Sequence, residues 1–129
     1  MTYLRYLPWF IWMGVIFYCS HLSPEPYQAP SGWISEFIQT LMEIPHIDKV
    51  MHMGAYFTLG VLGIFANKNR NLFAFIIGCI YAVSDEFHQS FIPGRHSDIY
   101  DVCADVVGLI LANYIFGFYY KKVLDKKNA

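Results

Sequence analysis

The stretch DEFHQSFIPGRHSDIYDVCAD, residues 85–105, decides the fold because it places acidic side chains between two strongly apolar segments. These segments are LFAFIIGCIYAV (72–83) and VVGLILANYIFGFYY (106–120). Asp101 and Asp105 stand at the start of a helix of membrane-spanning length, where a carboxylate costs roughly 2.5–3.5 kcal/mol. A counter-charge, a cation, a water-filled pocket or protonation must therefore compensate them.

The composition indicates a polytopic membrane protein. The chain has 129 residues, of which 56% are hydrophobic and 15% charged, and its length predicts a single domain over residues 1–129. The apolar residues form long blocks rather than the narrow stripes of amphipathic soluble helices. The net charge of −1 offers no basic surface for nucleic acid, so we expect no nucleic-acid partner.

Four apolar blocks predict an all-α fold, a membrane bundle of four spanning helices. They cover residues 6–20, residues 50–66 with a start near Ile47 or Asp48, residues 72–89, and residues from Ser97 or Asp98 to about 120. Small residues in the second and fourth blocks predict close helix packing: Gly54, Gly60, Gly63, Gly108 and Ala112.

The first connection, residues 21–49, predicts one more element. Residues 32–42 carry apolar side chains at helical spacing, which favours a short amphipathic helix on the membrane surface in the first outer loop.

The distribution of Lys and Arg predicts the topology. Arg5, the turn at residues 67–71 and the C-terminal tail are basic, whereas the connections 21–49 and 86–97 are poorer in Lys and Arg for their length. The positive-inside rule then puts both termini in the cytoplasm of a bacterial cell, with the protein in its inner membrane. Both polar connections lie outside.

Three of the predicted helices deliver polar residues to one depth on that outer side. Asp48 and His52 lie four apart on one face of the second helix, and Asp85 and Gln89 do the same on the third. Lys49 is expected to point elsewhere, and Glu86 to turn away from Asp85 into solvent.

The fourth helix carries a ladder of carboxylates. Asp98, Asp101 and Asp105 are spaced three or four apart, so they share a face and descend about 10 Å into the membrane. Arg95, in the preceding turn, can pair with one of these carboxylates or with an anionic substrate, because its planar fork suits phosphate and carboxylate.

Three functions fit this constellation. The polar residues can form a structural ion network, they can bind or modify an amphiphile of the envelope, or they can conduct protons or ions. For the preferred second function, the candidate catalytic residues are His52, Asp85 and Asp101, and the candidate substrate-binding residues are Asp48, Gln89, Arg95 and Asp98. A divalent cation is a candidate cofactor, with Asp98, Asp101, Asp105 and His88 as candidate ligands. Catalysis and simple binding both remain open.

Two parts of the sequence resemble the VanZ family of small bacterial membrane proteins. They are DKVMHMGAYFTLG (48–60) and SDEFHQSFIPGRHSDIYDVCADVVG (84–108), and the resemblance is strongest over residues 47–112. The positions that match the family pattern are Asp48, Lys49, His52, Tyr56, Leu59, Gly60, Asp85, Glu86, Gln89, Pro93, Gly94, Arg95, Asp98, Asp101 and Gly108. Asp105 departs from it, because many relatives are expected to carry Asn there.

The resemblance implies a polytopic membrane protein, and the name-giving member is linked to low-level resistance to the lipoglycopeptide teicoplanin. The expected partner is a membrane lipid or a lipid-linked component of the envelope, and tolerance of glycopeptide antibiotics is one expected outcome. The family brings no agreed biochemical activity.

Overall fold

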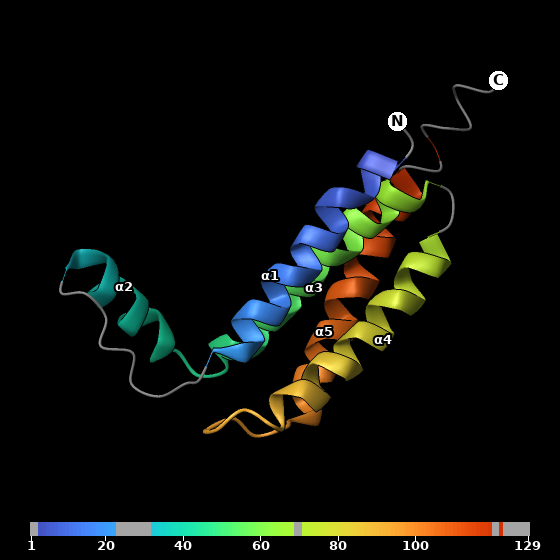
Figure 1. Cartoon of the computed structure of the whole chain (residues 1–129). Helices are drawn as coiled ribbons and strands as arrows, with labels where there is room; N and C mark the ends of the chain where they lie inside the picture. The colour runs from blue at the N-terminus through green and yellow to red at the C-terminus, as the bar shows by residue number, and fades with distance from the viewer. Residues whose placement is uncertain (1–2, 23–31, 69–70, 120–121, 123–129) are drawn as a thin grey trace.

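The computed structural model describes residues 3–22, 32–68, 71–119 and 122. Four helices lie side by side as a bundle: α1 (Leu7–His21), α3 (Ile47–Asn67), α4 (Asn71–Gln89) and α5 (Ile99–Ala112). The part of the chain that is described contains no strand, so the predicted all-α bundle is confirmed. α2 (Trp33–Met42) stands apart from the bundle beyond one end of it (Figure 1).

The helices begin and end close to where the sequence predicts. The helix of the second apolar block, α3, starts at Ile47, and that of the fourth block, α5, starts at Ile99 after the N-cap residue Asp98. The Asp98 carboxylate accepts a hydrogen bond from the Tyr100 backbone N–H at 2.9 Å, which satisfies a donor that the first helical turn leaves unpaired. The helical path of α5 continues through a π-helical segment, Asn113–Gly117.

The closest packing in the bundle is between α3 and α5, and it depends on glycine. A Cβ atom at Gly108 would overlap the backbone of Met53 and Phe57 on α3, and one at Gly60 would come within 2.7 Å of the Ala112 side chain on α5. The predicted close approach at Gly60, Gly108 and Ala112 is therefore confirmed. The same prediction for Gly54 is wrong, because nothing lies within 4 Å of a Cβ placed there.

Hydrogen bonds from side chains to backbone carbonyl oxygens fasten α1 to its neighbours. Trp12 Nε1 donates to the Ala55 carbonyl of α3 at 2.9 Å, and the Tyr81 hydroxyl of α4 donates to the Met13 carbonyl at 2.6 Å. Because these bonds join helices far apart in sequence, they fix α1 against both α3 and α4.

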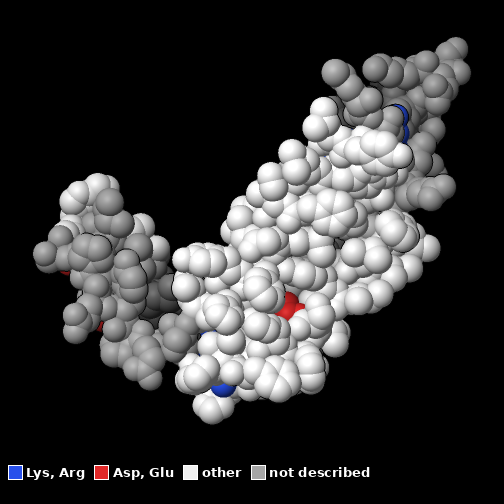
Figure 2. Space-filling view, viewed as in Figure 1, with Lys and Arg blue, Asp and Glu red and all other residues white. Residues whose placement is uncertain are grey.

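The outside of the bundle is apolar. Figure 2 shows a face with few charged residues, and large hydrophobic side chains such as Phe10, Ile80 and Phe118 are 60% or more exposed. Two helical stretches are long and apolar enough to cross a membrane, Ile47–Asn67 and Ile99–Gly117. α1 has 15 residues, and α4 ends in the polar residues DEFHQ, so neither meets that test of length and composition.

The predicted amphipathic helix forms as α2, with Trp33 and Phe37 both well exposed. Its placement on a membrane surface remains a prediction.

Candidate functional site

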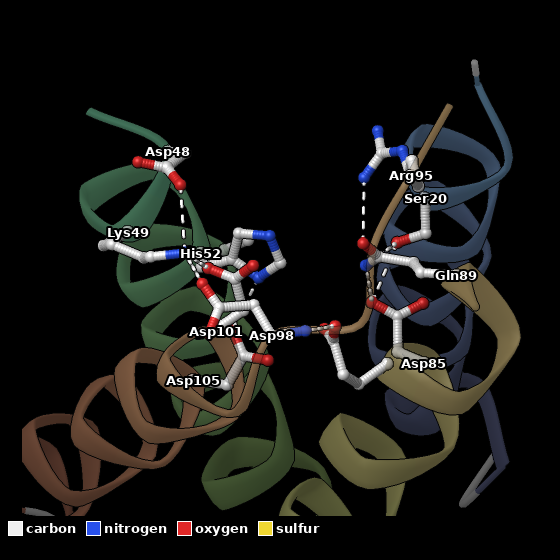
Figure 3. A network of polar contacts seen from close by, with 12 residues as sticks. Ser20, Asp48, Lys49, His52, Asp85, Gln89, Arg95, Asp98, Asp101 and Asp105 are labelled. Carbon is white, nitrogen blue, oxygen red and sulfur yellow. Dashed lines mark hydrogen bonds and ion pairs between the residues drawn. The ribbon is translucent and has the colours of Figure 1, made fainter. Parts of the chain in front are cut away.

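The polar residues predicted to converge lie at the end of the bundle from which α2 departs. They form two groups, one between α3 and α5 and one between α1 and α4 (Figure 3). The α4–α5 connection, residues 90–98, brings the two groups together because it is short and turns at Gly94, whose φ of 80° is one that L side chains rarely adopt.

Lys49 is the centre of the first group. Its Nζ atom lies 2.6 Å from carboxylate oxygens of both Asp98 and Asp101 and 3.0 Å from Asp48 (Figure 3). The prediction that Lys49 points away from the polar face was wrong. Lys49 and His52 are three residues apart, so both side chains turn toward α5. Lys49 is thus the counter-charge that Asp98 and Asp101 require.

Asp98, the residue that precedes α5, is stabilised in its charged form by Lys49. The hydrogen bond from Lys49, together with the bond from the Tyr100 N–H, holds the pKa of the Asp98 carboxyl below its ordinary value. A carboxylate that accepts such bonds is stabilised in its charged form. Asp98 therefore works as an ionised helix cap that also anchors α3.

His52 and Asp105 form the deeper pair of the first group. His52 Nδ1 lies 3.0 Å from Asp105 Oδ1, and the Asp105 side chain is 2% exposed. Figure 3 shows the second ring nitrogen of His52 pointing away from Asp105. Gly108, one helical turn further along α5, allows the approach of α3 that brings the two side chains together.

The second group is built on Asp85. Ser20 Oγ donates to Asp85 Oδ2 at 2.8 Å, and Gln89 Nε2 lies 3.3 Å from both the same carboxylate oxygen and Ser20 Oγ. Arg95 Nη1 donates to Gln89 Oε1 at 3.0 Å. Sequence reasoning missed Ser20, because a single serine at the end of an apolar block carries no distinguishing pattern.

Arg95 contacts the end of α1 rather than a carboxylate of the ladder, and its role toward an anionic substrate stays a prediction. Its Nε and Nη2 atoms donate to the carbonyl oxygens of Leu22 and Cys19, each at 3.1 Å, at the C-terminal end of α1. Within the described residues it forms no ion pair with a carboxylate. Arg95 instead donates to two main-chain carbonyl groups at the end of α1, and it ties the 90–98 connection to that helix.

Glu86 joins the two groups. Its Oε1 atom accepts a hydrogen bond from the Asp98 backbone N–H, and the residue is 5% exposed, so the prediction of a solvent-facing Glu86 was wrong. Among the described residues, three buried polar atoms near this junction lack a hydrogen-bond partner: Tyr56 Oη, Asp85 Oδ1 and Glu86 Oε2. Buried polar atoms are normally paired, so water, a proton or a ligand group is expected at these atoms.

A family model described as VanZ/LLP1 matches residues 6–120, which is most of the chain. The chain belongs to the VanZ/LLP1 family. A relative from Schizosaccharomyces pombe, named "Uncharacterized protein C11E3.10", is 29% identical over 90 residues, which cover 66% of this chain and 56% of that protein. The chain thus aligns with little more than half the length of this relative. No solved structure matches this chain. Family membership and the two long apolar helices together indicate a membrane protein.

The structure of this VanZ/LLP1 member does not bring the four candidate metal ligands together at one point. Asp98 and Asp101 hold Lys49, and Asp105 holds His52. His88 lies in the other group, with its Nε2 atom 3.3 Å from His21 Nδ1 and its ring stacked on Phe17. Across the described ranges, no cluster of three or more His, Cys, Asp or Glu side chains is arranged to hold a metal ion.

Among the candidate catalytic residues of this family member, His52 has the geometry best suited to proton transfer. A histidine that is held through Nδ1 by a buried carboxylate presents Nε2 as a base or acid, the arrangement used by many hydrolytic enzymes. Asp85 keeps one unpaired oxygen within the buried junction, whereas Asp101 is bound to Lys49. These carboxylates therefore differ in their surroundings: Asp101 is paired with a lysine, Asp105 positions a histidine, and Asp85 retains an unpaired oxygen.

Proposed function

We propose that this VanZ/LLP1 protein is a single-domain, multi-pass membrane protein that binds the polar head of an envelope amphiphile at the acid-rich end of its bundle and exchanges a proton with it through His52. The observation that carries the proposal is the His52–Asp105 pair, with its 3.0 Å contact and its buried carboxylate. In this function Asp105 orients the imidazole ring, and His52 Nε2 meets the substrate.

The charge distribution along the bundle supports an orientation with the acid-rich end outside. Arg5 and Lys68 both line one groove at the opposite end, far from Asp98 and Asp101. By the positive-inside rule the basic end faces the cytoplasm, so four crossings leave both termini there. In a bacterial cell the site would then face the outer leaflet of the inner membrane.

The surroundings of the site suit an amphiphile better than a small soluble substrate. Its polar side chains are bordered by apolar helix surface, and Phe87 and Phe91 are both more than 60% exposed beside the acid-rich end. A lipid-linked molecule can place its chain along such a surface while its head reaches His52. Tolerance of teicoplanin, the phenotype that the family resemblance implies, would be one consequence of a change to such a head group.

Native mass spectrometry of protein extracted gently from its own membrane tests the proposal. We expect the wild type to retain an amphiphile that His52→Gln and Asp105→Asn lose or retain in a chemically different form. His96→Gln removes an exposed histidine from the neighbouring connection and serves as the matched control. A bare wild type, or the same retained mass in all four proteins, would overturn the proposal, provided that their melting temperatures agree.

The three unpaired atoms favour a second candidate function, a proton path. Tyr56 Oη, Asp85 Oδ1 and Glu86 Oε2 are buried and have no hydrogen-bond partner among the described residues, and the His52–Asp105 pair lies at the same end of the bundle. Ionisable chains of this kind carry protons through membrane proteins. Proton flux into liposomes that Glu86→Gln abolishes would support this function, and equal flux in empty liposomes would exclude it.

A further inference from the structure

A groove at the opposite end of the bundle has no part in the proposed function. It has a volume of about 800 Å³ and lies between the short 3₁₀ helix Tyr3–Tyr6, α1, the end of α3 and the start of α4. Its lining residues are Arg5, Tyr6, Trp9, Phe10, Asn67, Lys68, Phe73 and Ile77. A volume of this size is typical of ligand sites.

The walls of the groove are apolar and open to the bundle exterior. Trp9 closes its floor, since the residue is buried and its indole ring packs against Gly63 of α3. Phe10 and Phe73 form the sides and are 60% and 50% exposed. A hydrocarbon chain can therefore lie between the two phenylalanines, in contact with Ile77.

The mouth of the groove is positively charged. Arg5 and Lys68 both line it, and its lining among the described residues includes no carboxylate. The Arg5 guanidinium is held in place, with Nη2 donating to the Tyr6 hydroxyl at 3.0 Å and the carbon Cζ lying 4.9 Å from the centre of the Tyr6 ring. Its Nε atom is buried and lacks a hydrogen-bond partner in the part of the chain that is described.

We infer that this groove binds one anionic phospholipid of the bilayer. The phosphate and the charged head group lie between Arg5 and Lys68, where the unpaired Nε of Arg5 gains an acceptor. One acyl chain follows Phe10, Phe73 and Ile77. The apolar walls distinguish this ligand from free phosphate. Because none of the described lining residues is a carboxylate, zwitterionic heads are disfavoured, since their cationic group would meet Arg5 and Lys68.

The inference is tested by the affinity of the purified protein for single lipids, measured by native mass spectrometry in detergent. The probes are phosphatidylglycerol and phosphatidylcholine with identical acyl chains. Each cation near a membrane surface is worth about a fivefold change in affinity for anionic lipid, so we expect Arg5→Gln with Lys68→Gln to weaken phosphatidylglycerol binding about 25-fold. Arg5→Lys keeps the charge and should stay within about threefold of wild type.

Two further variants distinguish lipid binding in the groove from non-specific attraction of anionic lipid to basic residues. Lys122→Gln removes a described lysine that does not line the groove, and it should leave the affinity unchanged. Ile77→Trp adds volume in the groove without altering charge, and it should weaken the binding of phosphatidylglycerol. Equal affinity for the two lipids, an unchanged affinity in the double variant, or full competition by inorganic phosphate would each overturn the inference.

Discussion

Replacing Gly108 by alanine is the most direct test of how the site is assembled. A Cβ atom there would lie 2.8 Å from the Phe57 backbone nitrogen and closer still to the Met53 carbonyl oxygen, whereas ordinary contacts begin at 3.4 Å. The obstructing atoms belong to the backbone, so they cannot rotate away. α3 and α5 must therefore separate by at least 0.6 Å, the difference between these two distances.

This separation is large enough to affect the site. His52 and Asp105 sit on the same two helices one turn from Gly108, and their 3.0 Å contact has little room to lengthen before it ceases to be a hydrogen bond. Overpacking of this kind costs about 1–3 kcal/mol in the free energy of unfolding. We expect Gly108→Ala to lose at least that amount and also to lose the retained amphiphile.

Gly54→Ala provides the matched control, because it adds the same methyl group to α3 at a position with nothing within 4 Å. The free energy of unfolding is measured by titration with a denaturing detergent, and the melting temperature by tryptophan fluorescence. If Gly108→Ala and Gly54→Ala unfold alike, α5 does not depend on this close approach, and the account of how His52 reaches Asp105 fails.

Three other predictions follow from the hydrogen bonds of the two groups. A double-mutant cycle between Lys49→Gln and Asp101→Asn should give a coupling free energy of about 1 kcal/mol or more, because they share a 2.6 Å contact; simple additivity would contradict this. The lowered pKa of Asp98 contributes stability above the unfolded value of 3.8, and this stability is lost as the pH falls through the lower folded value. The melting-temperature advantage of wild type over Asp98→Asn should therefore hold at neutral pH and decrease once the pH falls below 3.8. An advantage independent of pH would refute it. Arg95→Lys cannot reproduce three separate contacts, so it should increase hydrogen exchange in residues 90–97, while Lys122→Gln leaves the exchange unchanged.

The helices could be predicted from the sequence because each depends on local information. Apolar blocks, the N-cap at Asp98 and the break at Pro93 and Gly94 identify element boundaries without knowledge of neighbouring helices. The convergence of acidic residues at one end also followed, since antiparallel helices with short connections must alternate direction. Which side chains pair with one another could not be predicted from the sequence, because the pairing depends on how each helix is rotated about its axis.

Lys49 and Glu86 illustrate this limit. A spacing of four places Asp48 and His52 on one face of the helix, and the sequence therefore predicted that Lys49 points away from that face. In the structure Lys49 and His52, three residues apart, both face α5, and the long flexible side chain of Lys49 extends to Asp98 and Asp101. Glu86 was assigned to solvent because only one neighbour, Asp85, was considered, yet the start of α5 covers it.

The fastening of α1 has a consequence for how the sequence can vary. Three of the side chains that fasten α1, those of Trp12, Tyr81 and Arg95, form hydrogen bonds to main-chain carbonyl oxygens, which any amino acid supplies. A deep mutational scan should therefore be asymmetric. The three donors will tolerate few substitutions, whereas the acceptor positions can accept many side chains of suitable polarity without loosening the helix: Met13, Cys19, Leu22 and Ala55.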